Sequence, residues 1–186
     1  EQDRRTFLKS AALAAGYAGL SSLDASAFAA AQGANDRVRV VVVGFSDRFR
    51  GSLLPSFLQH HKANNFDIVG VCDIWSRRRD EGKAALEKAF GHPVATYRNT
   101  EELYAAGKDV DAVIISTADF QHAIHTVEAA RAGKDSYTEK PLAETMEDNR
   151  AVLKAVREHK RIVQIGSQRR SGANYIAAAE FIKQGK

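Results

Sequence analysis

Glu139, Lys140 and Pro141 form the stretch of this sequence with the clearest chemical potential. They directly follow Tyr137-Thr138, which predicts the end of a short β-strand. In an open parallel sheet, ligands bind beyond the carboxyl ends of the strands, so a charged pair here would face a bound ligand. Pro141 fixes the chain where it turns away from the strand, and the peptide bond before it can be cis. The alternative is a surface ion pair before a turn, which contributes little to stability.

The turn at Gly44-Phe45-Ser46 is a candidate phosphate site. It follows a β-branched run, residues 38–43, which predicts a strand buried on both faces. The helix after such a turn offers free N–H groups and a positive dipole end to a phosphate. Only the first glycine of the fingerprint G-x-G-x-x-G is in place, because Ser46 holds the second position. Gly51 could serve as the third glycine if the loop carried two extra residues, and a purely structural tight turn is the alternative.

Asp73 ends the second predicted strand, residues 66–72. A carboxylate at this position can accept hydrogen bonds from an adenosine ribose, and it would repel a 2′-phosphate. The sequence therefore favours NAD over NADP as the cofactor. Arg77, Arg78 and Arg79 follow and could partly offset that repulsion, although a solvated helix face is the more ordinary interpretation of three such residues.

Ser116 and Thr117 leave the fourth predicted strand at the same edge of the sheet. Thr117 or Asp119 can cap the helix that follows. His122, one turn into that helix, can point at a cofactor, and His125 follows one turn later. Two histidines at this spacing would suit a metal, but no third ligand is apparent, so we expect no metal site.

Gln168 and Arg169 follow the sixth predicted strand and again belong to the ligand edge. With Arg170 they give the start of the next helix a basic character, which the helix dipole disfavours. A basic helix start with no ligand is the alternative. The unfavourable charge slightly favours an anionic ligand at this position.

Strand-like and helix-like segments alternate six times with short connections, which predicts an α/β fold with a doubly wound parallel sheet. We expect one domain, residues 38–186, after a short polar linker at 31–37. The predicted strands are 38–43, 66–72, 95–97, 111–116, a stretch ending at 138, and 161–166. The predicted helices are 52–61, capped by Ser52 with Pro55 in its first turn, then 76–90, 100–107, 120–132, 145–159 and 173–184.

The composition excludes some classes of partner and site. The 186 residues include 27 Lys+Arg and 23 Asp+Glu, and a net charge of +4 is too small to indicate nucleic-acid binding. The single cysteine, Cys72, excludes an internal disulfide and a cysteine-based metal cluster. A hydrophobic content of 44% is enough for one core.

Residues 1–30 look like a twin-arginine signal peptide. Arg4-Arg5 is followed by Phe-Leu-Lys, an alanine-rich run at 11–20 and small-residue cleavage sites at 25–29. The run is too short to span a bilayer, so we expect no stable membrane insertion. An amphipathic helix, the alternative, leaves the paired arginines unexplained. We expect a periplasmic or otherwise exported protein, and a route that carries folded proteins suits one that loads its cofactor first.

These motifs together resemble the Gfo/Idh/MocA oxidoreductases over residues 38–186. The resemblance rests on Glu139-Lys140-Pro141, on Thr117 and His122, on Asp73 and on Gly166-Ser167-Gln168-Arg169, with 110–143 the most specific part. It implies that this is the Rossmann domain, which binds NAD or NADP, and that a second α/β domain covering the substrate is missing from this chain.

The same resemblance implies roles for individual residues. Lys140 would lie near nicotinamide and substrate as the catalytic residue, Glu139 and Pro141 would shape that edge, and His122 would help line the pocket. The altered glycine turn departs from the family's pattern. The predicted cofactor-binding residues are Gly44, Phe45, Ser46, Asp73, Ser116, Thr117, His122, Glu139, Lys140, Gln168 and Arg169.

Three functions remain open from the sequence. The first is an exported NAD(P)-dependent oxidoreductase acting on a sugar or polyol, of which this chain is the nucleotide-binding half. The second is a glycoside hydrolase that keeps its NAD bound and oxidises the sugar transiently. The third is a dinucleotide-binding module without catalysis of its own. We expect a sugar-like small molecule as substrate, no nucleic-acid partner, and a homo-oligomer at full length.

Overall fold

A computed structural model describes residues 37–185 of the chain. The chain divides into two units, residues 1–37 and 38–186, and the second holds all the elements described below. The predicted signal peptide at 1–30 and nearly all of the linker at 31–37 lie outside the described residues.

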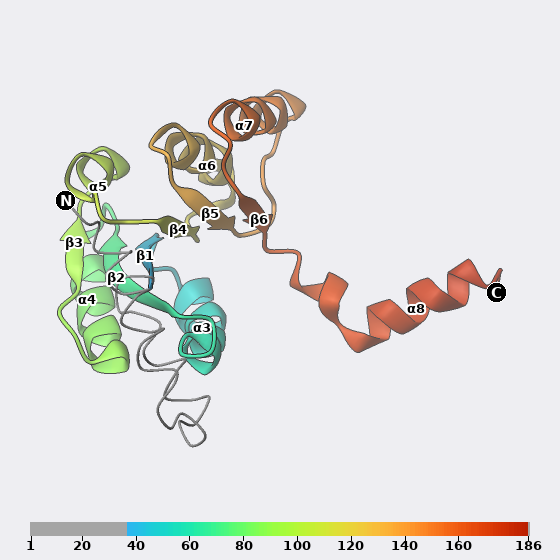
Figure 1. Cartoon of the computed structure of the whole chain (residues 1–186), viewed down its shortest axis with the longest axis horizontal. Helices are drawn as coiled ribbons and strands as arrows, with labels where there is room; N and C mark the ends of the chain where they lie inside the picture. Colours follow the sequence, from blue (N-terminus) through green and yellow to red (C-terminus); the bar gives the residue numbers. More distant parts are fainter. Residues whose placement is uncertain (1–36, 186) are drawn as a thin grey trace, which may run out of the picture. The chain divides into compact units, whose positions relative to one another are not determined.

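Six parallel strands form one sheet in the order β3-β2-β1-β4-β5-β6 (Figure 1). β1 lies in the middle of the sheet. The chain runs from β1 outward through β2 to β3, and then returns to the other side of β1 to form β4, β5 and β6. This is a doubly wound sheet whose order reverses between β1 and β4. The α/β fold predicted from the alternation of segments is therefore confirmed. The strands are β1 (Val38–Val43), β2 (Phe66–Cys72), β3 (Ala95–Tyr97), β4 (Ala112–Ile115), β5 (Asp135–Thr138) and β6 (Val163–Ile165).

The helices agree with the predicted ones within a few residues, except for the first. Asn99 and Thr145 cap α5 and α7 by accepting hydrogen bonds from the N–H groups of Glu102 and Asp148. The helices after β2 are α4 (Ser76–Phe90), α5 (Thr100–Ala106), α6 (His122–Arg131), α7 (Met146–Glu158) and α8 (Ala173–Lys183), with single 3₁₀ turns at Asp119–Gln121 and Gln168–Ser171.

β1 separates two hydrophobic cores. Because successive side chains of a strand point to opposite faces, Val40 and Val42 enter one core and Val41 and Val43 the other. The first core lies under α3 (Leu54–His60) and α4, and the second lies under α5 and α6. The central strand is buried on both faces, which explains its unbroken valine run.

The first helix begins earlier than predicted. The sequence predicts a loop to Gly51 and a cap at Ser52, but the chain is helical from Asp47. Ser46 is the cap, since its Oγ accepts a hydrogen bond from Phe49 N at 3.2 Å. The proposal that Gly51 is the third glycine of an extended loop is therefore wrong, because the helix already begins at Asp47 and a Cβ at Gly51 would have no packing neighbour within 4 Å.

A π-helical turn at Phe49–Leu53 interrupts this helix before α3. The N–H of Leu54 bonds to the carbonyl oxygen of Phe49, five residues back, and Pro55, which has no N–H, follows directly. Widened turns of this kind occur where the regular ladder is interrupted, and a proline interrupts it. Pro55 lies in the first turn of α3 itself but within a longer helical segment.

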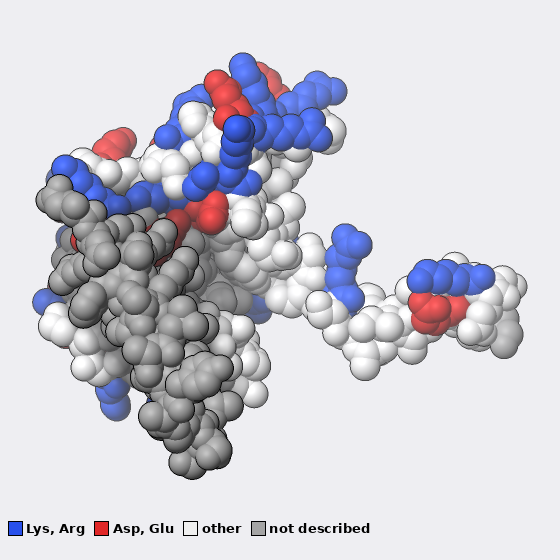
Figure 2. All heavy atoms as spheres, in the orientation of Figure 1, with Lys and Arg blue, Asp and Glu red and all other residues white. Residues whose placement is uncertain are grey.

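α8 stands away from the sheet (Figure 1). None of its residues is buried. Four large hydrophobic side chains each expose 46–70% of their surface: Tyr175, Ile176, Phe181 and Ile182. Its visible face carries few charges compared with the face over α7 (Figure 2). Among the described residues, no helix combines the length and the hydropathy needed to cross a membrane.

Two helical glycines make a matched test of packing at the first core. A Cβ at Gly82 of α4 would lie 2.9 Å from the ring of Phe45 and 3.0 Å from Val71, whereas a Cβ at Gly51 would have no described atom within 4 Å. We expect Gly82→Ala to lower the free energy of unfolding by about 1–3 kcal/mol through overpacking. We expect Gly51→Ala to raise it by up to about 1 kcal/mol through helix propensity. Urea denaturation of both variants checks this, and a stabilised Gly82→Ala would contradict the packing.

Cys72 provides a test based on pH. Burial, with the negative charges of Asp73 and Glu102, raises the pKa of its thiol from 9.0 to about 12. Between these two values the unfolded thiol has lost its proton and the native one has not, so the free energy of unfolding falls as pH rises.

Above pH 9 we expect the free energy of unfolding of the wild type to fall, relative to that of Cys72→Ala, by about 1.4 kcal/mol per pH unit. Denaturation midpoints of both proteins at pH 8, 9 and 10 measure it. Parallel pH profiles for the two proteins would show that the thiol does not titrate differently on folding.

Candidate functional site

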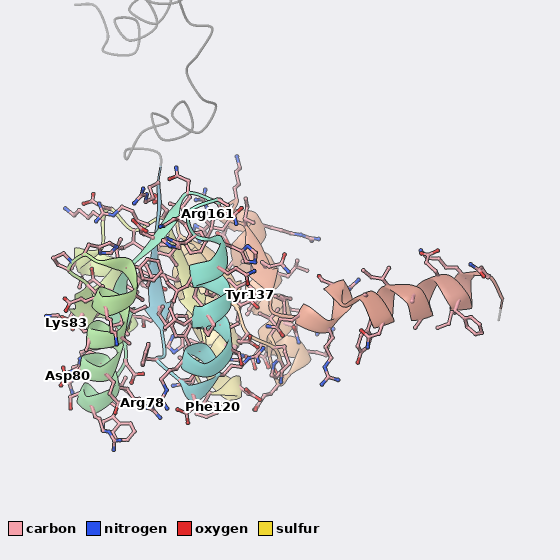
Figure 3. All side chains as sticks on the ribbon, turned by 90° about the horizontal axis from the view of Figure 1, so that it is seen from below. Arg78, Asp80, Lys83, Phe120, Tyr137 and Arg161 are labelled. Atoms are coloured by element: carbon pink, nitrogen blue, oxygen red, sulfur yellow. The ribbon has the colours of Figure 1, made fainter. Side chains whose placement is uncertain are left out.

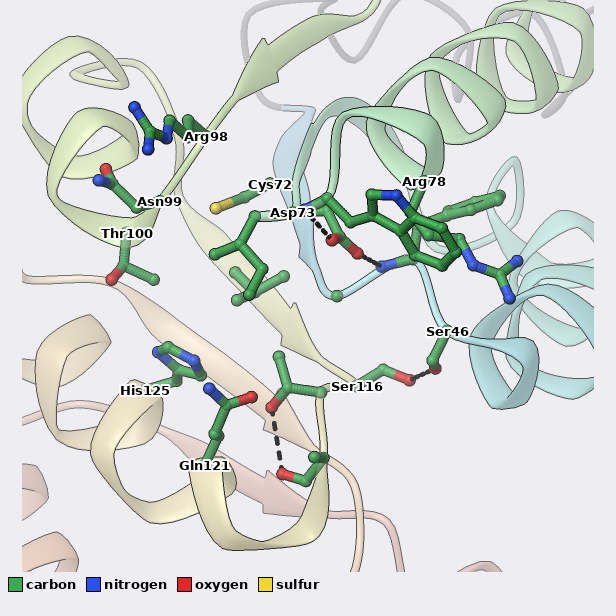
Figure 4. Close-up of a pocket in the computed structure, with 17 residues that line it drawn as sticks. Ser46, Cys72, Asp73, Arg78, Arg98, Asn99, Thr100, Ser116, Gln121 and His125 are labelled. Carbon is green, nitrogen blue, oxygen red and sulfur yellow. Dashed lines mark hydrogen bonds between the residues drawn. The ribbon is translucent and has the colours of Figure 1, made fainter.

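A cleft of about 480 Å³ opens at the carboxyl ends of β1, β2, β3 and β4 (Figure 4). The loops that leave these four strands line it, as expected at the point where the strand order reverses. Six of the predicted cofactor-binding residues line this cleft: Gly44, Phe45, Ser46, Asp73, Ser116 and Thr117.

Gly44 allows the turn after β1 to approach the end of β4. Its φ angle is +87°, and a Cβ here would lie 2.8 Å from both the Ser116 carbonyl oxygen and Thr117 Cγ2. A side chain at this position would therefore clash with backbone as well as strain the turn. The close approach, followed at once by the helix start at Asp47, is the geometry that receives a phosphate group.

Ser46 occupies the position of the second fingerprint glycine and makes two hydrogen bonds there. Its Oγ lies 2.8 Å from Ser116 Oγ across the base of the cleft and also caps the helix at Phe49 N. The serine therefore joins the turn after β1 to the loop after β4. Its side chain fills space that a glycine would leave open to the ligand.

Phe45 contributes its backbone to the cleft and its side chain to the core. The ring is completely buried, 5.6 Å from the ring of Phe49, and α4 makes room for it at Gly82. Its N–H donates to Asp73 Oδ2 at 2.9 Å. A contact between Phe45 and a cofactor would therefore involve the main chain.

Asp73 lies at the wall of the cleft, with its carboxylate tied to two backbone groups (Figure 4). Oδ2 accepts from Phe45 N, and Oδ1 accepts from Trp75 N at 2.9 Å. An ionised carboxylate has about four acceptor positions, so two remain for a ligand. The geometry thus holds the carboxylate in place and keeps it able to accept from ribose hydroxyls.

The three arginines after Asp73 are all engaged. Arg79 donates to the Asp73 carbonyl oxygen at 2.6 Å, and Arg77 pairs with Glu81 at 2.9 Å, a hydrogen bond that lowers the pKa of that glutamate. Arg78 lines the cleft and reaches Asp47 at 2.9 Å. Arg78 therefore joins the start of α4 to the start of the first helix.

His122 is buried beneath the loops and does not line the cleft. Its Nδ1 lies 2.7 Å from the Pro141 carbonyl oxygen and its Nε2 lies 3.2 Å from that of Thr117. The ring thus joins the loop after β4 to the loop after β5. His125 does line the cleft and bonds to Glu128 at 2.9 Å. Within residues 37–185 no group of side chains is arranged to hold a metal ion.

Glu139 forms the centre of a second group of residues, beyond β5. Its side chain is only 4% exposed, and Oε1 accepts from Arg48 at 3.2 Å and from Gln168 Nε2 at 2.6 Å. Gln168 also donates to the hydroxyl of Tyr137 at 2.7 Å. We call Arg48, Tyr137, Glu139 and Gln168 the Glu139 cluster. Burial is the main cause that raises the pKa of the Tyr137 hydroxyl.

Gly166 provides the space in which the Glu139 cluster forms. A Cβ there would lie 2.8 Å from both Gln168 Nε2 and the Tyr137 hydroxyl, and 3.2 Å from Glu139 Oε1. This explains on physical grounds why a glycine precedes Gln168 by two residues. Lys140 is exposed next to the cluster, and the bond between it and Pro141 is cis.

Arg169 lies outside both groups. It is exposed, belongs to a 3₁₀ turn, and donates to the hydroxyl of Tyr175 at 3.2 Å. A cofactor contact for Arg169, as for His122, Glu139, Lys140 and Gln168, stays a prediction. The structure brings Glu139 and Gln168 together with Lys140 beside them.

Sequence reasoning missed two features of the site. Arg98, Asn99 and Thr100 line the cleft after β3, and the same rule about strand ends would have found them, since β3 was predicted at its observed position. The pairing of Arg48 with Glu139 joins residues 91 positions apart, and no spacing pattern indicates it.

Comparison with known proteins agrees with the fold and the cleft. Residues 38–167 match the Gfo/Idh/MocA family, described as an oxidoreductase family with an NAD-binding Rossmann fold. Inositol 2-dehydrogenase of Salmonella typhimurium is 36% identical over 121 residues, covering 64% of this chain and 34% of that protein. For 1,5-anhydro-D-fructose reductase of Ensifer adhaerens the identity is 36% over 117 residues, covering 62% and 34%. The chain thus spans about a third of the length of these curated relatives.

A solved structure shares the architecture. The WlbA dehydrogenase of Bordetella pertussis, in complex with NADH and UDP-GlcNAcA, superposes with a TM-score of 0.67 at 26% identity, covering 80% of this chain and 42% of that one. The family match covers the whole sheet, and the Gly44 turn with Asp73 beside it fits a dinucleotide. The chain therefore belongs to the Gfo/Idh/MocA oxidoreductase family and forms its NAD-binding Rossmann domain.

Proposed function

We propose that this chain is the NAD-binding part of an oxidoreductase that acts on a sugar or polyol. The proposal rests on the arrangement of three strand ends at one edge of the sheet. The Gly44 turn follows β1, Asp73 follows β2, and Lys140 follows β5 at the same edge. The named relatives support the substrate class, since inositol and 1,5-anhydro-D-fructose are both polyhydroxylated rings.

The residues present fit NAD. The turn at Gly44 and the N–H groups at the start of the first helix would hold the pyrophosphate, and Asp73 would accept from the adenosine ribose. Asp73 also disfavours a 2′-phosphate. Arg78, which lines the cleft, already pairs with Asp47 and Glu81, which favours NAD over NADP.

Lys140 is the residue of this chain proposed to act on the substrate. Its side chain is exposed at the end of β5, and no described residue forms an ion pair or hydrogen bond with its ammonium group. NAD, when bound, supplies the acceptor for a hydride. Lys140 would polarise the reacting hydroxyl oxygen or assist the transfer of its proton.

Asp73 and Lys140 can be tested against each other in the whole protein. We expect Asp73→Ala to weaken NAD binding about 10–100-fold, because it removes hydrogen bonds to a charged group. We expect Lys140→Ala to lower turnover about 10²–10⁴-fold and to change NAD affinity only modestly. Calorimetric titration with NAD and the rate of NADH formation from a panel of polyols give the two readouts.

Each variant is the control for the other. Unchanged turnover in Lys140→Ala would remove the lysine from the mechanism, and unchanged NAD affinity in Asp73→Ala would refute the ribose assignment. A hydrolytic product formed without net NADH would replace the oxidoreductase by a redox-assisted glycoside hydrolase.

We also propose that the protein is exported through the twin-arginine route to the periplasm, and that it forms a homo-oligomer at full length. The export proposal rests on Arg4-Arg5 and the alanine-rich run that follows. We expect the whole protein to be recovered in the periplasmic fraction, and the double variant Arg4→Lys, Arg5→Lys to remain in the cytoplasm. Immunoblots of fractionated cells measure this, and periplasmic recovery of the double variant would contradict the route.

A further inference from the structure

The Arg48–Glu139 pair joins two elements that the proposed function uses separately. Arg48 is the second residue of the helix that begins at Asp47, directly after the turn predicted to hold the dinucleotide. Glu139 directly precedes Lys140. Arg48 reaches Glu139 Oε1 with two nitrogens, Nε at 3.3 Å and Nη2 at 3.2 Å.

The Glu139 carboxylate is buried, and both of its oxygens accept hydrogen bonds. Oε1 accepts from Arg48 and from Gln168 Nε2 at 2.6 Å, and Oε2 accepts from the backbone N–H of Lys140 at 3.2 Å. The side chain is 4% exposed, so each of these donors offsets part of the cost of burying its charge. The carboxylate thereby fixes the main chain at Lys140 directly, and it fixes the position of Gln168 after β6.

A second contact joins the same two elements. Phe57, further along the same helical segment, packs edge-on against Tyr137 of β5, with ring centroids 5.8 Å apart at 90°. Tyr137 lies beside α3 (Figure 3) and accepts a hydrogen bond from Gln168. The helix that follows the dinucleotide turn therefore contacts β5 through Phe57 and the residue directly after β5 through Arg48, once by aromatic packing and once by charge.

We propose that Glu139 is a positioning residue for Lys140, and that Arg48 couples the dinucleotide turn to the lysine through Glu139. This inference rests on the proposed function of Lys140. Arg48 closely follows the turn, so its two-nitrogen contact sets the position of Glu139 relative to the start of the helix. Arg48 is 45% exposed but its partner Glu139 is 4% exposed, so removing Arg48 also leaves a buried carboxylate with fewer donors. The test therefore uses readouts that a general loss of stability would not give: exchange at the segment that holds Lys140, and a loss of kcat without a matching change in the KM for NAD.

Arg50 provides the matched control. It lies on the same helix with a similar side-chain exposure of 51%, and it pairs with Asp47 and Glu81, not with Glu139. Arg48→Gln breaks the proposed coupling, and Arg48→Lys retains the charge. Arg50→Gln removes a similarly exposed arginine from the same helix, together with its surface ion pairs, without touching the cluster.

The first measurement needs no activity. Hydrogen–deuterium exchange of residues 137–143, in the chain without cofactor, reports the order of the segment that holds Lys140. We expect Arg48→Gln to accelerate exchange there at least fivefold, Arg48→Lys to restore part of the protection, and Arg50→Gln to match the wild type. Unchanged exchange in Arg48→Gln would overturn the coupling.

The second measurement is steady-state kinetics of the whole protein. We expect Arg48→Gln to lower kcat at least tenfold with the KM for NAD changed less than threefold, and Arg48→Lys to recover part of the kcat. A kcat within twofold of the wild type would overturn the positioning role. If Lys140→Ala keeps its turnover while the exchange result holds, the proposed role of Lys140 fails and the structural coupling stands, so the two failures are distinguishable.

Discussion

The close approach of Gly44 to the end of β4 is the contact on which the site depends. A single missing Cβ lets the turn after β1 lie against the Ser116 carbonyl oxygen. Only from this position does Ser46 Oγ reach Ser116 Oγ, and only from here does Phe45 N reach Asp73. The relative positions of the loops after β1, β2 and β4, which line the cleft, are thus set by the space left free at one glycine.

The other two glycine positions of the fingerprint hold different residues in this chain, Ser46 and Phe49. Phe49 stands where the third glycine would allow close packing between helix and strand. Its ring is completely buried against Phe45. The small residue that gives these rings room lies on the neighbouring helix instead, at Gly82 of α4. The chain keeps the glycine of the tight turn, Gly44, and the glycine that makes room for packing lies on another element.

Much of the fold could be predicted from the sequence because its signals are local. Buried strands read as apolar runs, Asn99 and Thr145 are regular caps, and Gly91 and Gly107 end helices where expected. The predicted start of the first helix was wrong because the cap is Ser46 and not Ser52. Ser46 prevails because it also bonds to Ser116, a contact between residues 70 positions apart that no local pattern reveals.

The candidate site was predictable to the same extent. Strand ends identify which residues share an edge, so Asp73, Ser116 and Glu139 were found by position. The positions of the strand ends do not indicate which of these side chains face a ligand and which hold the main chain in place. His122 was expected to line the pocket, yet its ring lies between two carbonyl oxygens under the loops. The partners of Glu139 come from three elements and required the assembled fold.

The π-helical turn before Pro55 has a consequence for the phase of the helix. Phe49 and Phe57 are eight residues apart, which is more than two full turns of a regular α-helix, since two turns take about seven residues. The turn contains one residue more than a regular α-helix would, and this residue brings the two rings onto one side, 6.4 Å apart. Because Phe57 then contacts Tyr137, that one additional residue aligns a row of aromatic rings from the cofactor turn to β5.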